Sequence, residues 1–127
     1  MKLKSLFSAA LLACSLIFET GCATKWIDKV SQARVTSSKI GYRAVSEFNA
    51  YYSAKTNKLN GTTKDLEAGR SLVYDSSRAL SLSLLTLESV ETAYRVAPTN
   101  QSPVVNALGA VTANVSNIIN TVNYITK

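Results

Sequence analysis

Three long segments of this chain repeat apolar residues at alternating steps of three and four, and this periodicity limits the fold more than any other feature. Such spacing places the apolar side chains along one face of an α-helix, and it does not match the period of two that a β-strand requires. The segments cover residues 25–58, 63–96 and 103–126 of the 127-residue chain. The sequence therefore predicts an all-α protein with three long amphipathic helices.

The first break between these segments carries signals for the end of one helix and the start of the next. Asn60 and Gly61 follow the first segment, and both residue types tolerate the left-handed backbone conformation that ends helices. Thr62, with Asp65 three residues later, matches a capping box in which the threonine side chain caps the helix. We therefore expect a short turn here and a new helix from about residue 63.

The second break is equally short and determines the topology. Pro98 ends the second segment, and Ser102 is expected to cap the third helix, with Pro103 at its first helical position. Connections this short place consecutive helices side by side in opposite directions. The sequence predicts a single domain over residues 22–127, folded as an up-down-up antiparallel three-helix bundle.

The first 22 residues have the pattern of an export signal. Two lysines precede an uncharged, mostly apolar run over residues 6–18, which is short for a membrane span but suits a signal peptide. The run ends in Glu19-Thr20-Gly21-Cys22, and small residues before a cysteine resemble the processing site of bacterial lipoproteins. This resemblance covers residues 1–22 only. It implies a signal peptide over residues 1–21, cleaved before Cys22, and acyl chains such as palmitate on that cysteine.

Alternatives to acylation at Cys22 stay open on the sequence. Glu19 stands where lipoproteins usually carry an apolar residue, and Cys14 follows Leu11-Leu12-Ala13, which is a second candidate site. Without lipidation the segment is an ordinary secretory signal or an uncleaved anchor. Ala23 follows Cys22, and Gram-negative lipoproteins with an aspartate there stay in the inner membrane. The resemblance thus implies lipid anchoring in the outer membrane, with the domain in the periplasm.

Composition excludes several kinds of chemistry. The chain has no histidine, which rules out histidine metal sites and Ser-His or Cys-His nucleophile systems. Fourteen Lys and Arg against eight Asp and Glu give a net charge of +6, but the basic residues are scattered. A scattered excess does not predict a nucleic-acid partner. Glu88 and Glu91 are expected at the surface, and we expect no enzyme, no cofactor and no metal site.

The third segment has an unusual polar side. From Val96 to Thr126 the sequence contains no charged residue. Amide side chains can form hydrogen bonds across helices without the desolvation cost of a charge. Three interpretations remain. The helix packs between the other two with its amides at the edges, or the amides form a face for another protein or a second copy, or the helix inserts into a membrane, which its five asparagines disfavour. The candidate interaction face comprises Asn106, Asn114, Asn117, Asn120 and Asn123.

Three residues just after Cys22 are candidates for the membrane interface. Trp26 lies four residues past the cysteine, between Lys25 and Lys29, and tryptophan with lysine suits the headgroup region of a bilayer. The alternative is that Trp26 belongs to the core at one end of the bundle.

These observations favour a small envelope lipoprotein that acts through protein interactions. Assembly factors, pilotins and exclusion or immunity lipoproteins belong to this functional class. The expected partners are the lipid bilayer and either an envelope protein or a second copy of the chain. The alternative is a secreted, membrane-active helical protein of the lysis or toxin type, whose amphipathic helices would enter the bilayer.

Overall fold

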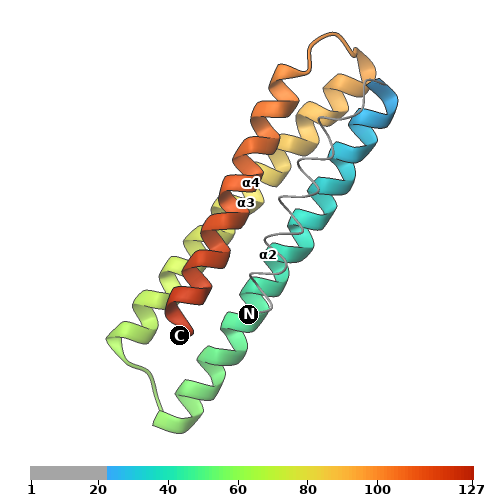
Figure 1. Ribbon diagram of the computed structural model, residues 1–127. Helices are drawn as coiled ribbons and strands as arrows, with labels where there is room; N and C mark the ends of the chain where they lie inside the picture. Colours follow the sequence, from blue (N-terminus) through green and yellow to red (C-terminus); the bar gives the residue numbers. More distant parts are fainter. Residues whose placement is uncertain (1–22) are drawn as a thin grey trace.

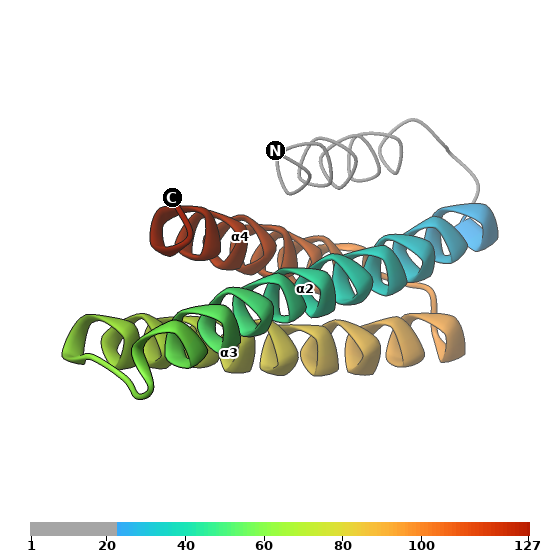
Figure 2. The same ribbon diagram turned by 90° about the horizontal axis from the view of Figure 1, so that it is seen from below.

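The computed structural model describes residues 23–127, and these residues form three helices joined by two short loops. Helix α2 covers Ala23–Leu59, α3 covers Lys64–Val96 and α4 covers Ser102–Ile125. Successive helices run in opposite directions along a common axis (Figures 1 and 2). The prediction of an all-α, up-down-up bundle of three long helices is confirmed. The predicted signal peptide, Cys14 and Cys22 lie outside the described residues.

One apolar core extends along the bundle, and it consists of the faces that the three–four repeat marks in the sequence. On α4 these residues follow one another closely, and Val111, Ile118 and Val122 have no exposed surface. The other helices contribute fewer large residues and several small ones, such as Ala33, Ala44 and Gly69. The largest fully buried side chains of the core are Phe48, Leu87, Ile118, Ile119, Val30, Val73, Val104, Val111, Val115 and Val122.

Helices α2 and α3 approach closely near the middle of the bundle. A Cβ atom placed on Gly41 would lie 2.3 Å from Cδ2 of Leu80. Gly41 is buried, so the space that a larger residue would need is already occupied by the leucine side chain. The glycine therefore permits contact between these helices despite the cost of glycine in a helix interior.

The loop between α2 and α3 has the predicted left-handed residue but a different cap. Asn60 has a φ of 52°, and the Gly61 N–H donates to the Thr56 carbonyl at 3.1 Å. The predicted cap at Thr62 is wrong by one residue. Thr63 has the extended backbone of a cap residue (φ −124°, ψ 163°), and its Oγ1 accepts a hydrogen bond from the Leu66 N–H at 3.2 Å.

The loop between α3 and α4 also differs by one residue from the prediction. Helix α4 begins at Ser102, so this serine belongs to the first turn and is not the cap. Its N–H donates to the Asn100 side-chain carbonyl at 3.0 Å. Gln101 occupies the cap position without a side-chain hydrogen bond to the helix. Because Asn100 satisfies the Ser102 N–H, the helix can start one residue earlier than the Ser-Pro pair indicated.

Candidate functional site

The amide side chains of α4 point mostly away from the core. Asn106, Asn117 and Asn120 are exposed, and their spacing of eleven and three residues places them on one side of the helix. Asn114 and Asn123 are half-buried at the edges. Of these two, Asn114 donates from Nδ2 to the Ala79 carbonyl of α3 at 3.4 Å. The structure thus brings three of the five predicted residues to one outward face, and it uses Asn114 in packing.

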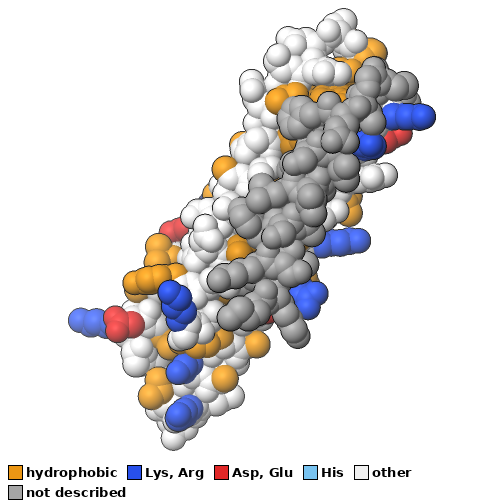
Figure 3. Space-filling model, viewed as in Figure 1, with side chains coloured by type: hydrophobic (Ala, Val, Ile, Leu, Met, Phe, Trp, Pro, Cys, Tyr) orange, Lys and Arg blue, Asp and Glu red, His pale blue; other side chains and the backbone are white. Residues whose placement is uncertain are grey.

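This outward side of α4 is uncharged over its whole length. Between the asparagines it carries exposed Gly109, Ala110 and Ala113, and near its end Tyr124, whose surface is 76% exposed. In the space-filling view, the part over α4 at the upper left shows mostly white and orange side chains (Figure 3). We call the surface formed by Asn106, Ala113, Asn117, Asn120 and Tyr124 the amide face.

Trp26 lies in the core, which is the second of the two interpretations that the sequence left open, and not at an exposed surface where it could contact a membrane. It is only 3% exposed, and its ring makes an edge-to-face contact with Tyr94 at 5.3 Å between centroids. The contact joins the start of α2 to the end of α3. Trp26 is in phase with the buried Val30 and Ala33, a signal that favoured burial over a bilayer contact. Lys25 is exposed and Lys29 half-buried, and their proposed role at a membrane stays a prediction.

A buried carboxylate next to this aromatic pair was missed by the sequence interpretation. Glu91 is 3% exposed, whereas Glu88 is exposed as expected. The Arg34 Nε lies 2.6 Å from Oε2 of Glu91, and the Ser31 hydroxyl donates to Oε1. The expectation that both glutamates lie at the surface is therefore wrong for Glu91. A charged residue is stable there because Arg34 and Ser31 replace the water it loses.

The network continues outward from Glu91 to the surface. Arg95 donates from Nη2 to the Ser31 hydroxyl at 2.9 Å and lies 2.9 Å from Oδ1 of Asp28. Two residues of α3 and three of α2 thus form one connected polar cluster. Each oxygen of the Glu91 carboxylate has one partner, Ser31 or Arg34 of α2, and the side chain is almost fully buried. The cluster therefore constrains how α2 and α3 align.

A second polar cluster lies at the opposite end of the bundle, around Glu67. Its carboxylate accepts hydrogen bonds from the hydroxyl of Tyr52 and, at 2.9 Å, from that of Thr62. The Arg70 guanidinium lies 3.5 Å from Glu67 and over the rings of Tyr52 and Tyr74 at 5.5 and 5.3 Å. The Tyr52 hydrogen bond, followed by that of Thr62, lowers the pKa of Glu67 below its ordinary value of 4.5.

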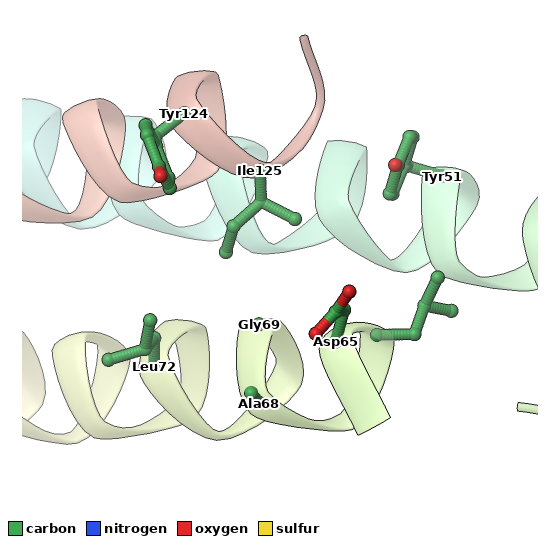
Figure 4. Close-up of a pocket in the computed structure, with 8 residues that line it drawn as sticks. Tyr51, Asp65, Ala68, Gly69, Leu72, Tyr124 and Ile125 are labelled. Atoms are coloured by element: carbon green, nitrogen blue, oxygen red, sulfur yellow. The ribbon is translucent and has the colours of Figure 1, made fainter. Parts of the chain in front are cut away.

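Beside this cluster the bundle has an open depression, which we call the distal notch. It lies where α4 ends, between the last turns of α2 and the first turns of α3, and its volume is about 540 Å³. The close-up shows Tyr124 and Ile125 on one side and Gly69 and Leu72 on the other, with Asp65 of α3 facing Tyr51 of α2 across the depression (Figure 4). The notch is lined by Tyr51, Asp65, Leu66, Ala68, Gly69, Leu72, Tyr124 and Ile125.

Within residues 23–127, no group of three or more Cys, Asp, Glu or His side chains is arranged to hold a metal ion. None of the helices α2, α3 and α4 has an apolar stretch long enough to cross a membrane.

Comparisons with protein-family models, with curated proteins and with solved structures give no match for this chain.

Removal of the buried carboxylate should destabilise the bundle far more than removal of its exposed neighbour. We expect Glu91→Ala to lower the free energy of unfolding by about 1–3 kcal/mol, because Arg34 and Ser31 lose their shared partner. Glu88→Ala, on an exposed position of the same helix, should change it by less than about 0.5 kcal/mol. Urea unfolding followed by circular dichroism measures both, and equal effects would show that Glu91 is solvated.

The hydroxyl of Tyr52 is expected to control the pKa of Glu67. In Tyr52→Phe the main hydrogen bond to the carboxylate is lost, so the pKa of Glu67 should rise toward its ordinary value. Because the folded-state pKa is lowered, the stabilisation by Glu67 is complete above the unfolded-state pKa and is lost as the pH falls through the folded-state pKa. A pH titration of the Glu67 side-chain carbon by NMR gives the value. An identical titration curve in Tyr52→Phe and Tyr74→Phe would contradict this assignment.

Proposed function

We propose that this chain is a non-catalytic envelope lipoprotein, anchored through acylated Cys22 in the outer membrane, whose bundle binds another envelope protein or a second copy through the amide face. The observation that carries the proposal is the exposed, uncharged side of α4. Water-exposed helix surfaces usually carry charged residues, and this one carries exposed asparagines with small residues between them. Such a surface can be buried against a partner without the cost of desolvating a charge.

The geometry of α2 supports an arrangement with the anchor at one end. The helix begins at Ala23, the residue after Cys22, and its 37 residues extend to Leu59. At 1.5 Å per residue, this helix is about 55 Å long. Acyl chains on Cys22 would therefore lie at the end that holds Trp26 and Tyr94, and the distal notch at the end farthest from the bilayer. The amide face would extend along the rod between them.

The proposed lipid anchor can be tested by measuring the intact mass of the protein. We expect the protein from the membrane fraction to begin at Cys22 and to carry two or three acyl chains. Cys22→Ser should abolish the modification, whereas Cys14→Ser should leave it unchanged, because residue 14 is removed with the signal peptide. An unmodified mature mass in all three proteins would disprove the lipoprotein proposal. Leakage of dye from liposomes treated with the purified protein would then favour the membrane-active alternative.

The interaction face can be tested by photo-crosslinking in intact cells. A benzoylphenylalanine residue at Asn117 should give a discrete adduct in the envelope fraction, because this position is exposed on the amide face. The same residue at Ser89, exposed on α3, serves as the matched control and should give none. An adduct of twice the chain mass would identify self-association. Equal adducts at both positions, or none at either, would contradict a specific contact through α4.

A further inference from the structure

We propose that the amide face binds a second copy of this chain, in a parallel homodimer whose two α4 helices pack side by side in register. This names the partner of the amide face, and it therefore rests on the function proposed above.

The outward side of α4 has a regular helical repeat of its own. Its residues follow one another at steps of four and three, as the buried residues of the same helix do, but they lie on the opposite side and are all exposed. They are Asn106, Ala110, Ala113, Asn117, Asn120 and Tyr124. A repeat of this period keeps one stripe of a helix facing a partner helix over its whole length, here about five turns. The partner that fits this stripe is therefore another helix lying along α4.

The distribution of charge indicates which helix this is. Helices α2 and α3 carry eleven Lys and Arg and seven Asp and Glu, whereas α4 carries no charged residue. A charged partner helix would lose water from its charges against α4 and gain no counter-ion there. The partner surface is therefore uncharged as well, and α4 is itself such a surface. Of the three described helices, α4 is also the one through which two copies with a net positive charge approach without facing like charges.

The asparagines make this face complementary to itself. An amide has both donors and an acceptor, so two identical asparagines can form reciprocal hydrogen bonds across a two-fold axis. In a parallel, in-register pair, each of Asn106, Asn117 and Asn120 meets the same residue of the second copy. Ala110 and Ala113 lie between these layers and let the two backbones approach. Buried asparagine layers fix the register and the oligomeric state of parallel helix pairs.

The proposed anchor determines that the two copies are parallel. Helix α4 begins at the end of the bundle where α2 begins, at Ala23 (Figure 1). Cys22 precedes Ala23 directly, so two chains acylated there and standing on one membrane present their α4 helices in the same direction. The two-fold axis then lies along the membrane normal. An antiparallel pair would place the two anchors at opposite ends of a rod about 55 Å long.

Single cysteines at two ends of the amide face test the proposal. Full-length Asn106→Cys and Asn120→Cys are oxidised mildly in isolated membranes, and disulfide-linked dimer is measured by non-reducing electrophoresis. We expect dimer at both positions, because each cysteine meets its own copy in a parallel, in-register pair. In an antiparallel pair one of the two positions could meet its own copy, but not both. Ser89→Cys, exposed on α3, is the matched control and should give at least tenfold less dimer.

A charge on the amide face provides a second measurement. Ala113 is exposed, so Ala113→Lys leaves the core intact, but in the dimer it would place two ammonium groups opposite each other. Combined with Asn106→Cys, this substitution should lower the yield of dimer at least tenfold. Ser89→Lys, combined with Asn106→Cys in the same way, should leave the yield unchanged.

The results distinguish failure of the dimer from failure of the proposed function. No dimer at Asn106 and Asn120, dimer at only one of them, or an equal yield at Ser89 would overturn the proposal. The proposed function would still hold if Asn117 crosslinks to a different envelope protein. The chain without an added cysteine should give no dimer, because Cys22 is acylated. A free thiol at Cys22 would contradict the anchor, and the same variants made with Cys22→Ser would still measure the contact.

Discussion

Burial of the apolar side of α4 between α2 and α3 is the interaction on which the rest of the structure depends. This helix supplies eight buried residues over 24 positions, most of them branched aliphatic side chains. Branched residues such as Val111 and Val115 lower helix propensity, so α4 is held as a helix mainly by tertiary packing. The same arrangement turns the asparagines outward. Packing of α4 therefore produces both the core and the amide face.

Two different contacts fix how α2 and α3 align beneath α4. At the end where α2 begins, the Trp26–Tyr94 ring pair lies beside the Glu91 network. An apolar contact and a buried ion pair therefore join α2 to α3 at the same end of the bundle. A buried ion pair adds little net stability but penalises any register in which it is broken. At the other end Glu67 joins Tyr52 of α2 to α3. Together these contacts hold the two long helices in one register, and α4 ends short of their loop.

The sequence predicted the helices and their order because periodicity and helix breakers are local signals. It did not predict the features that depend on contacts between residues far apart in the sequence. For Trp26 the sequence left a membrane interface and the bundle core both open, because its neighbouring lysines favoured the first and its phase with Val30 the second. Glu91 was assigned to the surface by its charge. Its burial requires Arg34 and Ser31, which lie some sixty positions away in the sequence. The distal notch depends on where three helices end relative to one another, which no local pattern determines.

Contact through the amide face is tested most directly by the reactivity of a cysteine placed at Asn117, compared in the purified protein and in intact cells. We expect rapid maleimide labelling of Asn117→Cys in the dilute purified chain, because the position is exposed, and strong protection in the envelope, where a partner covers the amide face. Ser89→Cys should react equally in both settings. Slow labelling of Asn117→Cys in the purified chain at every chain concentration would contradict the structure of α4, whereas labelling that accelerates on dilution would identify a second copy as the partner. Equally rapid labelling in cells and in the dilute purified chain would contradict the role of the amide face as a contact surface.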